Sequence, residues 1–273
     1  MSTKILEQLG TRTLLMGILN CTPDSFSDGG AFLSHEAALT QARKLIDEGA
    51  DILDIGGESS RPGADPTPLE DERQRVIPVI KKTRKDFPDL CISVDTYKSQ
   101  IAQEALDAGA DLINDISALR FDDQMAYVVA ESKCPVILMH MQGTPKTMME
   151  NPHYDDVVAD VIQFLRARID FAKSNGISSD KIIIDPGFGF GKRPQHNTAI
   201  LKRLLEFKVL KKPILLGTSR KSFLGAITKR PVQERLEETI ASAVAGVLNG
   251  ADIVRVHDVK AVKNALLVAD ALR

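Results

Sequence analysis

The sequence predicts an α/β protein that folds as one (β/α)8 TIM barrel domain over residues 1–273, and three observations support this. Eight short apolar runs alternate with longer segments whose apolar residues have helical spacing. Most of these runs are continuously apolar, as in parallel strands that are covered on both faces. The chain length suits a barrel, and no linker or low-complexity tract interrupts the alternation. A doubly wound open sheet is the alternative, because alternation alone does not show closure.

The predicted strands are rich in aliphatic residues, and most end beside a polar residue or a glycine. Their short length and even distribution match the repeated units of a barrel. In chain order they are Leu14–Leu19, Ile52–Ile55, Cys91–Val94, Leu112–Ile113, Val136–Met139, Ile182–Ile184, Ile214–Leu216 and Ile253–Val254.

The segments between the strands carry amphipathic patterns with recognisable ends. Ser34 is placed to cap a first helix, whose apolar stripe stops before Gly49. A similar stripe over residues 157–169 stops at an Asn-Gly pair. The phrase Gly-Ala-Asp occurs from Gly49, Gly109 and Gly250, each time between a predicted helix and a predicted strand. This repetition is typical of the αβ turn of a repeated βα unit.

Composition and charge exclude several classes of partner. The formal net charge of −2 argues against nucleic acid or an anionic membrane surface, since both favour a basic face. No apolar run approaches the roughly 20 residues of a membrane-spanning helix, and the N-terminus lacks a signal-peptide pattern. Cys21, Cys91 and Cys134 are widely spaced and odd in number. Neither a disulfide framework nor a zinc site is therefore expected, and a reducing cytoplasm fits best.

The residues at the carboxyl ends of the predicted strands are mostly polar. Such residues also mark where buried strands meet solvent, but eight in register, several inside Gly-rich turns, favour a functional site at that end of the barrel. In order they are Asn20, Gly56-Gly57-Glu58, Asp95, Asn114-Asp115, His140, Asp185, Ser219-Arg220-Lys221 and Arg255-Val256-His257.

The last strand indicates an anion site. Arg255 and His257 are two residues apart, so they project from the same face. In a closed barrel this strand adjoins the first, which brings Asn20 beside the pair. A guanidinium and an imidazole suit a phosphate group. A salt bridge from Arg255 to a neighbouring aspartate is the alternative.

Two loops have the character of mobile or ligand-contacting segments. The loop after the first strand, residues 20–30, is too long for a tight turn, ends in two glycines and carries Phe26, so it resembles a lid. The loop after the second strand, residues 56–63, presents Arg61 beside Pro62.

Three further strand ends carry Asp95, Asn114 and Asp185. These groups suit acid–base chemistry, and they equally suit recognition of the N–H and C=O edge of a heterocycle. The glycine-rich segment 185–192 is not a dinucleotide fingerprint, and segment 217–222 lacks the glycine of a P-loop but enters a predicted helix start, which favours anions. His140 has no second ligand at metal-site spacing, so a lining role is expected.

Eight sequence blocks together resemble the dihydropteroate synthase family of pterin-binding barrels. They run in the family's order over nearly the whole chain. The blocks are NCTPDSFSDGG from Asn20, GGESSRPGA from Gly56, SVDTYK from Ser93, INDIS from Ile113, LMHMQGTPKTM from Leu138, DPGFGFGK from Asp185, GTSRKSFLG from Gly217 and RVHD from Arg255.

The resemblance implies a homodimeric folate-biosynthesis transferase that uses Mg2+. The implied reaction condenses 6-hydroxymethyl-7,8-dihydropterin diphosphate with para-aminobenzoate and releases diphosphate. The implied mechanism is a dissociative substitution, since the site offers anion-binding groups and no nucleophile–base pair. A corrinoid-dependent pterin methyltransferase and a non-catalytic pterin-binding paralogue are the alternatives, but neither needs the predicted diphosphate cluster.

The resemblance also implies roles for individual residues. Asn20 is the implied metal ligand, and the implied pterin-binding residues are Asp95, Asn114, Asp185 and Lys221. The implied diphosphate-binding residues are Asn20, Ser60, Arg61, Arg255 and His257. The implied para-aminobenzoate pocket comprises Phe26, Ser60, Arg61, Pro62, Phe190, Lys221 and Ser222. The implied catalytic set is Asn20, Arg61, Asp95, Asp185, Lys221, Arg255 and His257.

Two positions depart from the family pattern. Ser60 stands where the family often has threonine, and Cys21 stands where valine is usual. Both keep the local chemistry, but the methyl group absent at Ser60 loosens packing against a substrate or a sulfonamide. The sequence therefore leaves the response to sulfonamides open.

Overall fold

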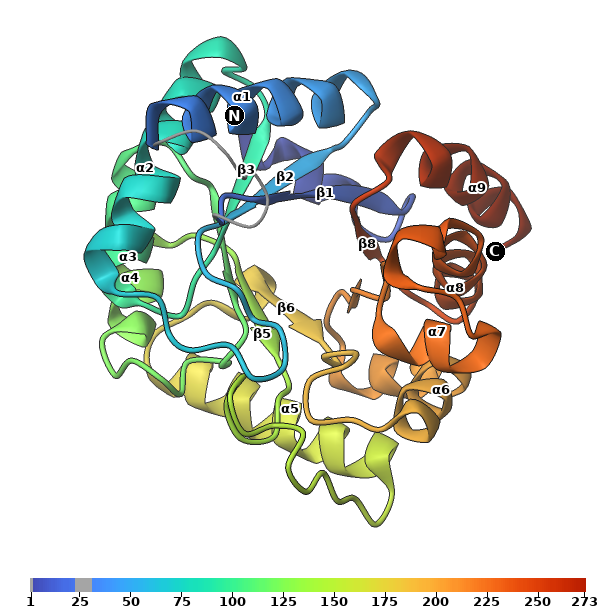
Figure 1. Ribbon diagram of the computed structural model, residues 1–273. Helices are drawn as coiled ribbons and strands as arrows, with labels where there is room; N and C mark the ends of the chain where they lie inside the picture. The colour runs from blue at the N-terminus through green and yellow to red at the C-terminus, as the bar shows by residue number, and fades with distance from the viewer. Residues whose placement is uncertain (1, 23–30) are drawn as a thin grey trace.

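The strands form a closed parallel barrel. The computed structural model describes the backbone of residues 2–22 and 31–273, and the side chains of residues 4–22 and 35–273. Eight strands lie in the order β6-β5-β4-β3-β2-β1-β8-β7, and a parallel bridge from Ile184 to Ile214 joins β6 to the start of β7. The predicted (β/α)8 barrel is thus confirmed, and the open sheet is excluded. Figure 1 looks along the barrel, with helices arranged around the strands.

All eight strands were predicted, and the differences lie at their ends. The strands are β1 (Leu14–Asn20), β2 (Ile52–Gly56), β3 (Cys91–Asp95), β4 (Leu112–Asp115), β5 (Val136–Met139), β6 (Ile182–Asp185), β7 (Leu215–Leu216) and β8 (Ile253–Val256). The prediction ended β4 and β8 two residues too early, because it stopped before the first polar residue. Asn114 and Arg255 continue these strands, and their polar side chains face the inside of the barrel.

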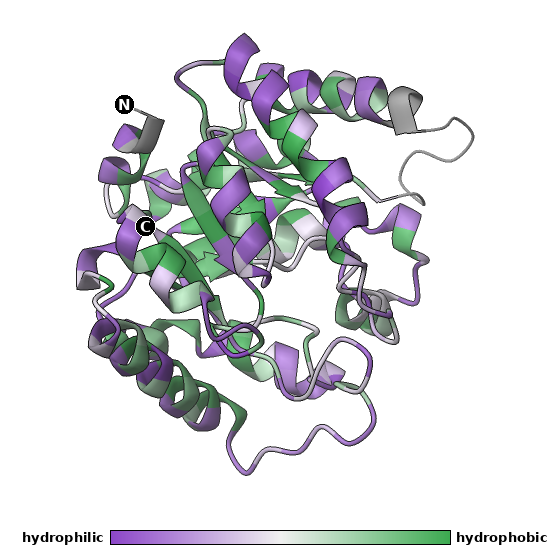
Figure 2. Ribbon diagram, turned by 90° about the vertical axis from the view of Figure 1, so that its left-hand side faces the viewer, coloured by the Kyte–Doolittle hydropathy of each residue, from purple (hydrophilic) through white to green (hydrophobic). Residues whose placement is uncertain are grey.

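The α-helices cover the outside of the barrel. They are α1 (Ala31–Asp47), α2 (Leu69–Asp86), α3 (Ser99–Asp107), α4 (Met125–Ser132), α5 (Val157–Ser174), α6 (Pro194–Lys202), α7 (Ser222–Thr228), α8 (Leu236–Leu248) and α9 (Val259–Leu272). Single-turn and short 3-10 helices supplement them: η1 (Ser2–Gln8), η3 (Ser179–Lys181), η4 (Leu204–Leu210) and η5 (Val232–Glu234). Helix α1 begins before Ser34, so the predicted cap position was wrong. Figure 2 shows hydrophobic strands surrounded by helices with mixed faces.

The two-residue period of a strand divides each one into an inner and an outer set. Outer residues such as Leu53, Ile92 and Val254 join one large cluster with the helices. Inner residues at the start of the strands form a second cluster that closes the barrel floor, with partly buried residues of the N-terminal segment packed against it. The floor residues are Leu14, Met16, Ile52, Cys91, Leu112, Ile137, Ile183, Leu215 and Ile253. The barrel is therefore sealed at this end, and a ligand site is confined to the other.

The repeated Gly-Ala-Asp turns have a common physical role. Each glycine has a positive φ, between 98° and 108°, which favours glycine at the end of a helix. Asp51, Asp111 and Asp252 each accept a hydrogen bond from the backbone N–H of a residue in or just before a neighbouring strand, at 2.9, 2.9 and 2.8 Å. Each also pairs with a cationic side chain. The repeat thus fixes where three strands begin, and so where they end.

The described residues include no helix with the length and apolar character that crossing a membrane requires.

Candidate active site

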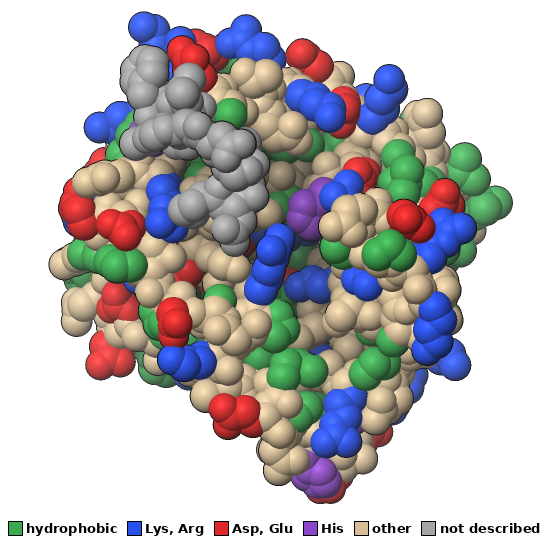
Figure 3. All heavy atoms as spheres, in the orientation of Figure 1, with side chains coloured by type: hydrophobic (Ala, Val, Ile, Leu, Met, Phe, Trp, Pro, Cys, Tyr) green, Lys and Arg blue, Asp and Glu red, His purple; other side chains and the backbone are tan. Residues whose placement is uncertain are grey.

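A layer of polar and charged side chains lies above the apolar floor. Asp54 and Ser93 each follow a floor residue by two positions, so they face the same interior. Arg255 stands in the same relation to Ile253 on β8. In the direction of the strands, apolar inner residues therefore give way to charged ones. Figure 3 shows a hollow in the middle of one face of the molecule, bordered by Lys and Arg side chains and a His.

Arg255 is held between two carboxylates from other strands. Its Nε donates to Oδ2 of Asp54 at 2.6 Å, and its Nη2 donates to Oδ2 of Asp95 at 2.7 Å. The salt bridge considered from the sequence is therefore present, with two partners. Burial disfavours the charged guanidinium, but Asp54 and Asp95 outweigh burial and raise the pKa of Arg255. The guanidinium remains charged at all relevant pH values.

Asp95 and Asn114 meet the same network. Burial raises the pKa of Asp95 to about 7; Arg255 opposes this shift, and the carboxylate of Asp54 adds to it. Asn114 is 4% exposed, and its Nδ2 donates to Oδ2 of Asp54 at 3.1 Å. Oδ1 of Asp54 and Oγ of Ser93 are buried without a hydrogen-bond partner in the described part of the chain. Buried polar atoms of this kind are rare unless a ligand or water completes them.

A second set joins Asp185, Lys221 and Phe190. Burial raises the pKa of Asp185 to about 6. Two effects oppose this shift: the backbone N–H of Gly187 donates a hydrogen bond to the carboxylate at 2.7 Å, and Lys221 lies nearby with its positive charge. Burial lowers the pKa of Lys221 to about 8, with a further lowering by Arg255. The ammonium of Lys221 lies 4.3 Å from the centre of the Phe190 ring, a cation–π contact. A carboxylate, a cation and an aromatic face thus stand together.

His257 is neutral and has an oriented ring. Burial and the charges of Arg255 and Arg220 lower its pKa to about 3. Its Nδ1 lies 2.9 Å from Oγ of Ser219. When the Ser219 hydroxyl donates to Nδ1, the ring proton lies on Nε2 and forms a neutral donor.

An ion pair fastens the loop after β7 to the loop after β8. Arg220 donates to both oxygens of Asp258 at 2.9 and 2.6 Å. Arg220 also has a φ of 56°, a left-handed conformation that is unusual for arginine. Because Arg220 is between Ser219 and Lys221, and Asp258 follows His257, the pair sets the spacing of those site residues.

The loop after β2 is braced on both sides. Glu58 accepts hydrogen bonds from the Tyr97 hydroxyl at 2.6 Å and from the backbone N–H of Thr67 at 3.0 Å, and it pairs with Lys98. The backbone N–H of Gly63 donates to the carbonyl of Pro145 at 3.0 Å.

Between these braces the predicted residues are accessible. Ser60 is half-buried, and Arg61 and Pro62 are exposed. Arg61 makes no ion pair with any residue whose side chain is described.

The structure places two of the remaining predicted residues, Asn20 and Ser222, but not Phe26. Asn20 ends β1 and is half-buried, and its strand adjoins β8 as expected for a closed barrel. Ser222 is exposed at the start of α7. Phe26 lies outside the described residues. Within the described ranges, no group of three His, Cys, Asp or Glu side chains is arranged to hold a metal ion.

Sequence reasoning missed several members of the site. Asp54 is a charged residue inside an apolar strand, and its period-two relation to Ile52 was the available signal. Ser219 was predicted only as one of the polar residues at a strand end, without a role of its own, and Lys192 only as the end of a glycine-rich block. Their partners are distant in sequence, and spacing alone does not reveal such contacts.

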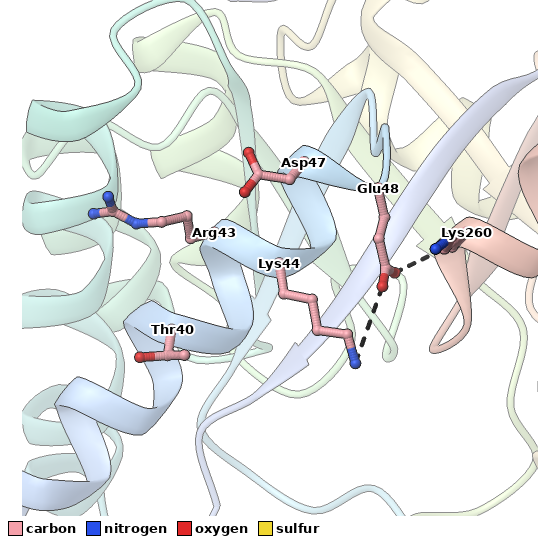
Figure 4. Close-up of a pocket in the computed structure, with 6 residues that line it drawn as sticks. All are labelled: Thr40, Arg43, Lys44, Asp47, Glu48 and Lys260. Carbon is pink, nitrogen blue, oxygen red and sulfur yellow. Dashed lines mark hydrogen bonds and ion pairs between the residues drawn. The ribbon is translucent and has the colours of Figure 1, made fainter.

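A separate hollow lies on the outer surface and is not part of this layer. It is lined by Thr40, Arg43, Lys44, Asp47, Glu48 and Lys260, on α1 and at the start of α9. Glu48 lies 4.0 Å from Lys44 and accepts the backbone N–H of Lys260 at 3.3 Å (Figure 4). Arg43 pairs with Asp86 and Lys44 with Glu48, so these charges have partners within the surface.

The arrangement matches known proteins along nearly its whole length. Residues 16–257 match the family model of pterin binding enzymes. The dihydropteroate synthase of Synechocystis sp. is 47% identical over 264 residues, covering 96% of this chain and 91% of the relative. The chain belongs to the dihydropteroate synthase family. The polar layer therefore lies in a barrel whose relatives act on pterins.

Solved structures of the family superpose closely. A Yersinia pestis dihydropteroate synthase with a sulfonamide drug has a TM-score of 0.91 and 43% identity, and covers 96% of this chain and 95% of that one. A Xanthomonas albilineans dihydropteroate synthase with 4-aminobenzoic acid has a TM-score of 0.90 and 45% identity, with coverage of 96% and 93%. The family membership predicted from eight sequence blocks is confirmed.

We expect Arg255→Met to destabilise the fold in a pH-dependent way. The substitution leaves Asp54 and Asp95 buried without their counter-charge, which costs about 3–5 kcal/mol in other buried pairs. The folded-state pKa of Asp95 is already raised, so the unfolded chain releases this proton more readily, and stability falls as pH rises above the ordinary carboxyl range. Urea unfolding should therefore show a larger loss against the parent chain at pH 8 than at pH 5.

Arg43→Met is the matched control, because Arg43 pairs with Asp86 at 3.1 Å on the surface with a 60% exposed side chain. This control should change stability by less than about 1 kcal/mol at either pH. Equal losses in the two variants, or a loss independent of pH, would show that Arg255 does not compensate the buried carboxylates.

Proposed function

We propose that this chain condenses 6-hydroxymethyl-7,8-dihydropterin diphosphate with para-aminobenzoate to give 7,8-dihydropteroate and diphosphate. The observation that carries the proposal is the buried polar layer, in which carboxylates and an amide lie beside Arg255 and Lys221 above a sealed apolar floor. A flat heterocycle with both N–H and C=O groups satisfies such a layer. A related structure from Xanthomonas albilineans, 42% identical, is a complex with 7,8-dihydropteroate, which contains such a heterocycle.

The pterin ring is assigned to Asp95, Asn114, Asp185 and Lys221. Ionised carboxylates only accept hydrogen bonds, so Asp95 and Asp185 suit the amino and ring N–H groups. The amide of Asn114 and the ammonium of Lys221 suit the ring carbonyl and nitrogen lone pairs. Asp54 joins this set, because its buried Oδ1 lacks a partner within the described chain.

The diphosphate is assigned to Asn20, Ser60, Arg61, Arg255 and His257. Arg255 uses one N–H of Nε and one of Nη2 for its carboxylate partners. A guanidinium has five N–H donors, so three remain for phosphate oxygens. A neutral Nε2–H of His257 adds a donor, and Arg61 provides a cation from the loop above.

Mg2+ fits this site only together with the substrate. Three carboxylates, Asp54, Asp95 and Asp185, outnumber the two cations Arg255 and Lys221, so the layer alone does not neutralise a diphosphate. Mg2+ usually binds one or two protein oxygens, waters and substrate phosphates. The Asn20 amide oxygen would hold it, and the bound ion would neutralise leaving-group charge.

The para-aminobenzoate pocket is assigned to Phe26, Ser60, Arg61, Pro62, Phe190, Lys221 and Ser222. Phe190 provides an aromatic wall, 7% exposed, with the Lys221 ammonium over its ring. Arg61 and Ser222 are exposed at the mouth, where a carboxylate group would lie.

In the proposed reaction the C–O bond breaks first, and its electron pair leaves with diphosphate. The electron-rich dihydropterin delocalises the positive charge on its methylene carbon, and Asp95 and Asp185 stabilise that charge. The neutral aryl amine then forms the C–N bond and loses a proton to solvent. No general base is needed, because an aryl amine is unprotonated at pH 7.

We expect diphosphate release in a single turnover both with and without para-aminobenzoate, and 7,8-dihydropteroate formation only with it. A dissociative reaction does not need the amine for C–O cleavage, so rapid-quench measurement of diphosphate should detect it in both cases. Release that requires the amine at every stage would exclude the dissociative mechanism. No release under either condition would favour a non-catalytic paralogue, and methyl transfer to a corrinoid would favour the methyltransferase.

We expect kcat/KM for the pterin substrate to fall as pH drops through about 6, the pKa of Asp185. Below that pH the carboxyl is protonated, and one of its oxygens no longer accepts a hydrogen bond. The pKa of Asp95 is also raised, to about 7, so the pH profile alone does not show which of the two carboxyls causes the fall, and a variant is needed. Asp185→Asn should have lower activity and should lack the component near pH 6. An unchanged acid limb in Asp185→Asn would assign that component elsewhere.

The proposed assembly is a homodimer, and the proposed compartment is the cytoplasm. Apolar side chains on α8 and α9 are exposed, with Leu248 at 47%, Leu267 at 61%, Val268 at 61% and Leu272 at 71%. Such a patch is typical of an interface. Cys21, Cys91 and Cys134 are free and buried, which fits a reducing compartment.

We expect sedimentation equilibrium to give the mass of two chains, and the double substitution Leu267→Glu/Val268→Glu to give that of one. Burying two carboxylates at an apolar interface opposes association. The exposed Tyr127→Glu, on α4, is the control and should stay dimeric. A monomer in the unsubstituted protein would contradict the assembly.

A further inference from the structure

Lys192 is a fully buried lysine whose ammonium is surrounded by neutral acceptors. The residue is 2% exposed, and no described carboxylate lies within ion-pair distance of it. Its Nζ donates to the carbonyls of Gly187 at 2.9 Å and Phe190 at 3.0 Å, and lies 2.7 Å from Nδ1 of His140. Fully buried lysines normally have a charged partner. Burial lowers the pKa of Lys192, and the charge of Asp185 opposes this lowering. The three close acceptors match the three hydrogens of an ammonium group and so favour the protonated form.

The chain that provides these acceptors winds around the ammonium. Gly187, Gly189 and Gly191 all have positive φ, at 73°, 83° and 65°. A Cβ at Gly187 would lie 1.9 Å from the His140 carbonyl oxygen, so only glycine fits. The alternating Gly-Phe pattern thus turns backbone carbonyls inward, toward Nζ. The residues that precede Lys192 in the sequence therefore also surround its side chain in space.

His140 completes the enclosure. It is 4% exposed, and its ring packs edge-on against Phe164 with centroids 4.8 Å apart. Burial and the charge of Lys192 lower the pKa of His140, so the ring is neutral. With Nδ1 as an acceptor, its proton lies on Nε2. This accounts for a histidine at a strand end that has no metal-ligand spacing.

The enclosed loop carries parts of the proposed site. Asp185 lies at its start, and Phe190 contributes both the carbonyl bound by Nζ and the ring under the Lys221 ammonium. The side chain and the carbonyl belong to one residue, so a displaced carbonyl displaces the ring. Asn197 holds the loop from the other side, accepting from the Gly189 N–H at 2.7 Å.

We propose that Lys192 is a positioning residue, whose ammonium holds the carbonyls of Gly187 and Phe190 so that the Phe190 ring forms the wall of the para-aminobenzoate pocket. This inference rests on the proposed function. The close partners of the ammonium all lie inside the protein, so we do not assign it a contact with either substrate. Lys192 acts through the conformation of the loop. We expect loss of Lys192 to affect para-aminobenzoate more than the pterin, because Phe190 lies in the loop whereas Asp185 is held in β6.

The main test compares Lys192→Met with the parent enzyme. Methionine retains an unbranched apolar chain but removes the three donors. The KM for para-aminobenzoate should rise between about 10- and 100-fold, as for small displacements of positioning groups. The KM for the pterin substrate should rise less. Lys202→Met, at an exposed position on α6, is the control and should leave both constants unchanged.

Chemical rescue separates the charge from packing. Lys192→Ala removes three carbons and the nitrogen, so n-propylammonium replaces the missing atoms. Added n-propylammonium should restore the KM for para-aminobenzoate, and n-propanol of the same size should restore much less. Equal rescue by both would reduce Lys192 to a space-filling residue and overturn the proposal.

Two further outcomes are decisive. If Lys192→Met does not fold, His140→Phe keeps a ring against Phe164, removes one acceptor, and should raise the same KM by a smaller factor. An unchanged KM in a folded His140→Phe or Lys192→Met would overturn the proposal. Failure of the proposed function is distinct, because the parent enzyme would then release no diphosphate.

Discussion

The ion pairs of Arg255 with Asp54 and Asp95 are the constraint on which the site depends. They join β8 to β2 and β3 through the interior, at the level where the apolar floor ends. One guanidinium permits two carboxylates to stay buried, and burial in turn gives those carboxylates their strength as acceptors. The cation also lowers the pKa of Lys221 and of His257. Closure of the barrel is what brings these charges together.

Most of the fold followed from local pattern. The apolar runs predicted all eight strands, and Gly-Ala-Asp marked three strand starts, because helix ends, glycine and turn chemistry are local properties. The partners of Arg255 did not follow, since register and side-chain reach across a barrel are not local. The sequence offered a phosphate role and a salt bridge as alternatives. In the structure Arg255 forms the salt bridge with two of its N–H groups, and its other N–H groups stay available for a phosphate.

The predicted site residues divide in the same way. Asp95 and Asp185 end their strands, and Asn114 and Arg255 lie one residue before a strand end, so strand geometry brings these four to one layer. Ser60, Arg61 and Pro62 lie on a loop, and their distance from Arg255 depends on braces such as Glu58 with Tyr97, which no spacing rule predicts. Asp54 was missed because it lies inside an apolar run and not at a strand end, whereas a strand's inner face includes every second residue.

In three of the sequence blocks, a residue that is proposed to bind a ligand occurs with a residue that holds the frame. Lys221 is proposed to bind the pterin, while its neighbour Arg220 pairs with Asp258; His257 is proposed to bind the diphosphate, while its neighbour Asp258 receives that ion pair. Asp185 opens its block in the polar layer, and Lys192 closes the block beneath a cage of carbonyls. A shared motif therefore cannot by itself assign a ligand role to each of its members. The hydrogen bonds of each side chain make that distinction, because a group whose donors are all used inside the protein has none left for a substrate.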